Sequence, residues 1–177
     1  LVNEKHSFSL IVNVVNNKFN PTGSNVSDVN DNTNTLASSY ETKNKANNHW
    51  KNYAVNLNHK VKIDTLGTEL NTDFDWANYG NRNEQDFTTR YYDLDGAEFQ
   101  KPYILEGNIE GVLNIIGLKT DFTTTFKNKV KLESGLKSTY VKSDNELTLY
   151  DWSSGSPVLD ETKSNHFIYK ENINAAY

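Results

Sequence analysis

The chain is patterned with a period of two residues. From Tyr53 to Ile63 the odd-numbered positions carry Tyr, Val, Leu, His, Val and Ile, whereas the even-numbered positions carry Ala, Asn and Lys. Successive side chains of a β-strand point to opposite faces of a sheet, so this segment has one apolar face and one polar face. The alternation recurs along the chain and predicts an all-β protein built from long strands.

Six long strands are predicted, and we expect them to pair antiparallel in sequence order. They cover about residues 6–19, 36–63, 70–92, 103–126, 130–151 and 165–177. Residues 21–35 are rich in turn-forming Asn, Asp, Ser and Thr, although 24–31 also reads as an extension of a strand. Asp95-Gly96 favours a tight hairpin turn. The links near residues 65 and 128 are short, whereas the other links are longer.

The alternation also predicts which side chains share a face. We expect Val55, Leu57, Val61, Phe74, Trp76, Leu132 and Leu136 on one face, and Asn56, Asn58, Asp73, Asp75, Glu133 and Lys137 on the other. Aromatic residues such as Tyr140, Tyr169 and Tyr177 are expected at the two ends of the apolar bands. The strand that ends at Ile63 is polar on both faces before Trp50.

Composition indicates lipid as the solvent of the apolar face. Hydrophobic residues make up 36% of the chain and its mean hydropathy is −0.73, which is low for a soluble core, yet 12% aromatics argue against disorder. Ten steps of ~3.3 Å at a tilt of ~40° span roughly 25 Å, the height of a membrane band. We therefore predict an up-and-down transmembrane β-barrel, with a soluble β-sheet protein as the alternative. No apolar run is long enough for a membrane helix.

Few residues in the sequence are candidates for a catalytic, metal or cofactor site. The chain has no cysteine, which excludes disulfides and thiolate chemistry. Its net charge is −5 and it has no basic stripe, so we expect no nucleic-acid partner. The four histidines lack metal-ligand spacing and are read as dispersed, and residues 28–39 depart from a calcium loop because Thr33 replaces the required Gly. His166 with Asp151 and Ser153 is the one catalytic grouping the residues allow, and nearness in a loop is its sole support. We expect no enzymatic activity, cofactor or metal.

Three segments carry a family resemblance. Residues 44–58, 135–141 and 165–177 resemble the outer-membrane barrel family of TonB-dependent-receptor-like proteins, and the similarity runs over nearly the whole chain. The resemblance implies a bacterial outer-membrane receptor that takes up a bulky nutrient. It also implies an inner-membrane energy-coupling protein and a surface lipoprotein as partners, through regions outside this chain. Alternatives are a non-transport scaffold or surface-assembly barrel, and a soluble β-sandwich binding module.

Six strands are too few to close a barrel in lipid, because single-chain bacterial barrels have at least about eight. We therefore expect residues 1–177 to be one partial barrel domain whose first and sixth strands do not pair, without a plug domain in this segment. The polar face would line the lumen, as a hydrated wall or as a contact for a solute or plug. Its candidate residues are Lys60, Asp73, Asp75, Lys119, Asp121, Glu133 and Lys137.

Overall fold

The fold is a single antiparallel sheet of eight strands. The computed structural model describes residues 5–127 and 129–177. The strands are β1 (His6–Phe19), β2 (Thr22–Asn30), β3 (Leu36–Lys62), β4 (Glu69–Tyr92), β5 (Tyr103–Thr125), β6 (Lys131–Asp151), β7 (Val158–Leu159) and β8 (Asn165–Ala176). Within these ranges, no helix is long and apolar enough to cross a membrane.

The eight strands correspond to the six predicted ones, because β1 and β2 follow each other along one edge of β3 and β7 and β8 follow each other along one edge of β6. We call each of the six positions across the sheet a row, and the rows pair in sequence order, as predicted. β1 and β2 pair with the two halves of β3 in one continuous register, from His6↔Val61 through Thr22↔Lys45. Pro21 lies between them, where its missing N–H interrupts an edge strand, and its carbonyl still accepts a bond from Ala46 N at 2.9 Å. β7 and β8 pair with two parts of β6, and the register shifts between these two pairings. β1 and β8 lie in the two outer rows and do not pair with each other, so the described sheet is open.

The polar stretch after Phe19 is mostly strand. β2 occupies residues 22–30, which confirms the predicted strand extension, and the turn is confined to the residues that follow. Cross-strand bonds such as Ser24 Oγ to Glu41 Oε1, at 2.8 Å, help hold β2 on β3. A ladder of backbone bonds therefore overrides the weak strand propensity of Asn, Asp and Ser here.

The hairpin turns follow their sequence signals. Gly96 has a φ of +80° and Gly67 a φ of +95°, a conformation that glycine adopts without strain. The carboxylate of Asp93 accepts bonds from Asp95 N at 3.0 Å and Ala97 N at 2.8 Å, which completes the predicted Asp-Gly turn. Asp64 caps the turn at Gly67 in the same way, accepting from Leu66 N and Thr68 N.

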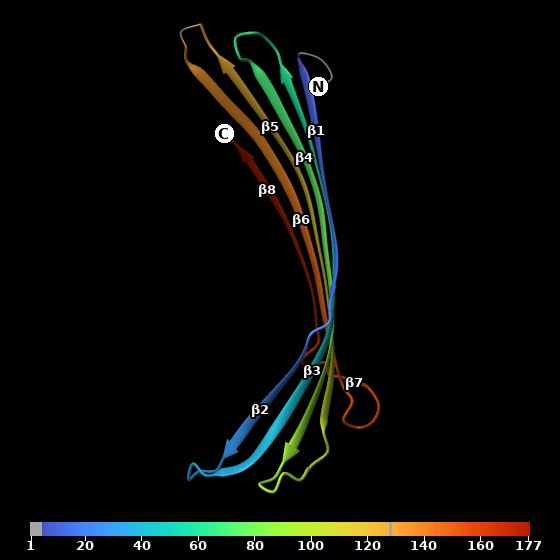
Figure 1. The fold of residues 1–177 in the computed structure, drawn as a ribbon. Coiled ribbons are helices and arrows are strands. Elements are labelled where there is room, and N and C mark those ends of the chain that lie inside the picture. The colour runs from blue at the N-terminus through green and yellow to red at the C-terminus, as the bar shows by residue number, and fades with distance from the viewer. Residues whose placement is uncertain (1–4, 128) are drawn as a thin grey trace.

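The sheet is one curved layer with no second layer against it. Figure 1 shows it nearly edge on, with both ends bending to the same side. Ala46 is the only buried hydrophobic residue among those described, and large side chains such as Leu10 (64% exposed) and Leu136 (66% exposed) lie open. The described sheet therefore has no hydrophobic core, and its apolar side chains need a cover other than this chain.

The sheet has two faces and two halves, which we name by residues. Side chains opposite one another in the ladder share a face, so the register defines a Leu57 face and an Asn56 face. The short-turn half comprises residues 53–62, 69–77, 115–125 and 131–141 of β3–β6, next to the links near residues 65 and 128. The long-loop half comprises residues 36–52, 78–92, 103–114 and 142–151 of the same strands.

Candidate functional site: the two faces of the sheet

In the short-turn half the two faces have the predicted composition. On the Leu57 face, Leu57 lies opposite Leu10 and Phe74, and Phe74 lies opposite Leu118. The remaining residues predicted for each face follow the same register, so the face assignment is confirmed. Leu57 is 44% exposed and Leu118 is 52% exposed. The face is thus an uncovered apolar band over neighbouring strands.

Two histidines predicted to be dispersed lie together on this band. His59 stacks on Phe8 with ring centroids 4.1 Å apart, and its Nε2 lies 3.2 Å from Nδ1 of His6. The prediction was wrong because the contact joins residues far apart in sequence. The β1–β3 register, which only the structure supplies, brings them side by side.

The seven predicted candidate residues all lie on the Asn56 face. Asp73 lies opposite Asn58 and Lys119, and Lys119 lies opposite Lys137. The same register places the other four on this face in the short-turn half, namely Lys60, Asp75, Asp121 and Glu133. The structure brings them together as one charged belt across β3–β6.

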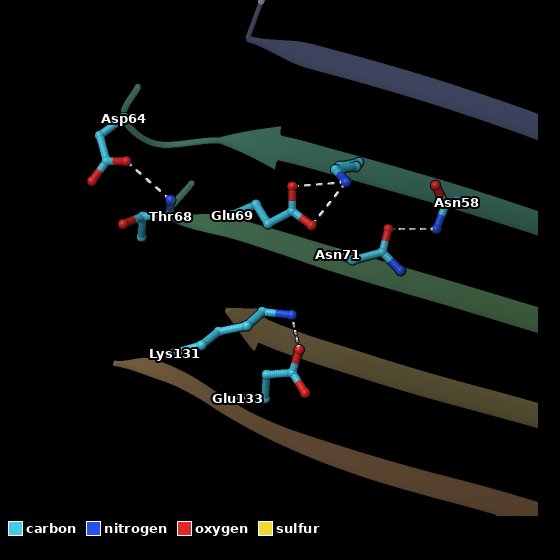
Figure 2. Close-up of polar contacts among 8 residues, drawn as sticks. Asn58, Asp64, Thr68, Glu69, Asn71, Lys131 and Glu133 are labelled. Carbon is cyan, nitrogen blue, oxygen red and sulfur yellow. Dashed lines mark hydrogen bonds and ion pairs between the residues drawn. The ribbon is translucent and has the colours of Figure 1, made fainter. Parts of the chain in front are cut away.

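Hydrogen bonds within this belt link neighbouring strands. Asn58 Nδ2 donates to Asp73 at 2.7 Å and to Asn71 at 2.8 Å, and Lys60 pairs with Glu69 at 2.7 Å. Figure 2 shows the Asn58–Asn71 bond, and an ion pair within one strand between Lys131 and Glu133. These contacts make the belt a connected polar wall with its charges largely paired.

At β8 the expected distribution of aromatics is reversed. The β6–β8 register places Ala175 opposite Lys137, so Tyr177 lies on the Asn56 face, and Tyr169 lies there too. The Tyr177 hydroxyl donates to Asp121, and its ring covers Gly135, where a Cβ would lie 2.5–2.7 Å from ring atoms. The expectation that Tyr169 and Tyr177 border the apolar band was therefore wrong. Alternation within a strand does not tell which way the whole strand turns against its neighbour.

In the long-loop half the polarity of the two faces is exchanged. The Leu57 face carries charges in pairs, such as Arg82 with Glu84 at 2.8 Å and with Glu110 at 3.4 Å. Apart from Asp151 at the end of β6, the Asn56 face of this half holds no charged residue among residues 36–52, 78–92, 103–114 and 142–151. It carries amides, hydroxyls, aliphatic and aromatic side chains instead. The prediction that this segment is polar on both faces did not separate charged from uncharged side chains. The sequence already shows the separation, because the charged residues from Glu41 to Lys51 all occupy odd-numbered positions.

We call the Asn56 face of the long-loop half the uncharged surface. On β3 its side chains are more buried than those on the Leu57 face of the same half. Ala46 is 5% exposed and Asn48 is 9% exposed, whereas Lys43, Lys45 and Asn47 on the opposite face are exposed. Near the tip, the ring centroids of Tyr40 and Tyr91 are 6.2 Å apart. Crowding of this kind is expected on the concave side of a curved wall, where side chains converge.

The residues of the predicted catalytic grouping and of the calcium-like loop form hydrogen bonds between neighbouring strands or within turns. His166 Nε2 contacts Asp144 Oδ1 at 2.7 Å rather than Asp151 or Ser153, so the structure does not assemble the catalytic grouping. Asp151 instead accepts a bond from Ser153 N. Asp31 accepts bonds from Thr33 and Thr35 within its own turn, and the hydrogen bond from the Thr33 hydroxyl is the main cause that lowers the pKa of its carboxyl. These contacts account for the segment as a turn.

A single-layer antiparallel wall, apolar on one face and charged on the other, is the wall of an outer-membrane β-barrel. Residues 61–177 match the model of the outer membrane protein beta-barrel family. Because the match covers more than half of the sequence, the chain belongs to this family, and it is located in the outer membrane. No curated protein matches the chain significantly.

Proposed function

We propose that the chain is the wall of a TonB-dependent-receptor-like barrel that takes up a bulky nutrient across the outer membrane. The observation that carries the proposal is the charged belt on the Asn56 face, opposite the apolar band that meets lipid. A face with Lys60, Asp73 and Lys119 is suited to water and to a mobile solute. In this account the belt lines the lumen.

The energy for uptake would come from an inner-membrane coupling protein, and a surface lipoprotein would assist capture. Both partners would act through parts of the protein outside residues 1–177. The barrel would bind and pass its solute without catalysing a reaction, since its charged groups are engaged in wall contacts such as Lys60–Glu69.

A scaffold or surface-assembly barrel is the second candidate. It is favoured by the connected pairing of the charged belt, because a wall whose charges bind one another holds fewer free groups for a solute. The soluble β-sandwich has less support, since the described residues form one sheet with no partner sheet.

Transport and scaffolding differ in their need for energy. Cells carrying the full-length gene are compared with a deletion strain and with a strain lacking the inner-membrane coupling protein, in growth on defined nutrient mixtures. We expect one nutrient class to support growth only when both genes are present. Surface assembly defects with unchanged growth on every nutrient would contradict transport and support the scaffold.

A further inference from the structure

The uncharged surface of the long-loop half contains a depression in the Asn56 face. Its volume is about 330 Å³, and it is lined by Trp50, Asn52, Tyr79, Asn81, Gly111 and Asn145 among others. These residues come from β3, β4, β5 and β6, so four adjacent strands build it. The volume falls at the lower end of the range of small-molecule sites.

Gly111 forms the floor of the depression. A Cβ at this position would lie 3.1 Å from Oδ1 of Asn145 and closer still to Oδ1 of Asn81. The two amide oxygens therefore converge over a residue without a side chain. The amide nitrogen of Asn145 donates to Ser143 Oγ at 2.8 Å, which leaves its oxygen as the group turned toward the floor.

Two converging acceptors call for a ligand that donates hydrogen bonds. Further along the same face, Oδ1 of Asn44 and Oδ1 of Asn83 are buried and lack a partner among the described residues. Buried acceptors are normally bonded, so unpaired ones require an explanation. Because these oxygens are buried, a ligand on this face reaches them only when the side chains of Asn44 and Asn83 turn outward, and a chain of hydroxyl groups would then supply the donors.

The aromatic rings beside the depression and the absence of charged residues among those that line it narrow the chemical class of the ligand. Trp50 and Tyr79 stand on neighbouring strands at the depression, and Tyr79 is 41% exposed. Exposed aromatic faces pack against apolar C–H surfaces, while their polar tips and the nearby amides bond hydroxyls. A charged ligand would lose hydration here without gaining an opposite charge.

We propose that this depression binds one unit of an uncharged oligosaccharide, with Trp50 and Tyr79 packing on the sugar ring and Asn81 and Asn145 accepting from its hydroxyls. The rest of the oligosaccharide would extend along the uncharged surface toward Asn44 and Asn83. The inference rests on the proposed function, because it names the substrate class of the same lumen.

The test measures binding to the full-length protein in detergent by isothermal titration calorimetry. Probes are short neutral gluco-, manno- and galacto-oligosaccharides, their sulfated counterparts and an uncharged hydrophilic peptide. We expect at least one neutral oligosaccharide to bind and its sulfated form to bind much more weakly. Binding of the peptide alone, or equal binding of sulfated and neutral sugars, would overturn the proposal.

Matched variants locate the site. Tyr79→Ala and Asn81→Leu should each weaken sugar binding by about tenfold, as loss of one ring contact or one acceptor predicts. Tyr150→Ala and Asn108→Leu, on the opposite face of the same half, should leave the Kd unchanged. Gly111→Ala adds one methyl group at the floor and should also weaken binding. If the two faces respond alike in correctly folded variants, the site is not in this depression.

The two proposals fail separately. Energy-dependent uptake of a nutrient other than a sugar, with no oligosaccharide binding, would remove this inference and leave the transport function standing. Sugar binding that depends on Tyr79 and Asn81 but supports no energy-dependent uptake would support the inference and remove the transport function.

Discussion

The two halves of this sheet use the same strands and the same ladder, yet they place charge on opposite faces. In the short-turn half the Leu57 face is apolar and the Asn56 face carries the charged belt. In the long-loop half the Leu57 face carries Arg82, Glu84 and their partners, and the Asn56 face is uncharged apart from Asp151 at the end of β6. A strand keeps its alternation throughout, so we infer that the surroundings change: lipid would meet the Leu57 face in one half, and water would meet it in the other.

Substitution by arginine on the Leu57 face should give the largest difference in stability between the two halves. Leu118→Arg places a charge in the apolar band and should destabilise the folded protein in phospholipid vesicles by about 2–4 kcal/mol. Asn108→Arg, on the same face and strand in the long-loop half, adds a cation beside Glu106, which Asn108 already contacts at 3.2 Å. Equilibrium unfolding in urea should show little change for this control. Similar losses for both variants would contradict the comparison.

The aromatic row of β8 is the exception to this division. Gly135→Val would place a side chain where the ring of Tyr177 now lies, so we expect a loss of about 1–3 kcal/mol. Gly23→Ala is the control, because nothing lies within 4 Å of its added Cβ.

Hydrogen exchange of β8 then shows where the loss occurs. Faster exchange confined to the β6–β8 pair is expected for Gly135→Val, since Tyr177 would leave Asp121. Unchanged exchange in β8 would mean that Tyr177 does not pack over Gly135.

Much of the fold could be predicted from alternation alone. The six rows, their order and the faces of Leu57 and Asn56 follow from a period of two, and the Asp-Gly turn follows from glycine at positive φ. The face of β8 could not be predicted, because one residue of register turns Tyr177 from one side of the sheet to the other. The depression at Gly111 also escapes the sequence, since it forms where four strands meet.

Asparagine side chains in the two halves should contribute differently to the free energy of unfolding. Asn58 donates to Asp73 and Asn71, so Asn58→Ala should destabilise the protein by about 0.5–1.5 kcal/mol. Asn44 holds a buried oxygen without a partner, and Asn44→Ala should cost less or be neutral in the absence of ligand. Urea unfolding in vesicles compares the pair. A larger loss for Asn44 than for Asn58 would contradict the assignment of Asn44 as unpartnered.

The loop that holds β7 predicts a small effect of pH. Hydrogen bonds from Lys163 and Thr162 lower the pKa of Asp160 to about 2, from an ordinary value of 3.8. Because the folded pKa is the lower one, ionised Asp160 stabilises the loop above pH 3.8, and this contribution is lost as the pH falls from 3.8 to about 2. A carboxyl ¹³C titration should give a midpoint near the lower value. A midpoint at the ordinary value would show that Asp160 does not hold the loop.

The most direct measurement of the exchange of faces is the accessibility of spin labels in a bilayer. The chain has no cysteine, so single cysteines at Leu57 and Asn47 can each carry a nitroxide on the same strand and the same face. Collisions with oxygen, which concentrates in lipid, should dominate at Leu57, and collisions with a water-soluble nickel complex should dominate at Asn47. The same preference at both positions would contradict the account that lipid meets this face in only one half of the sheet.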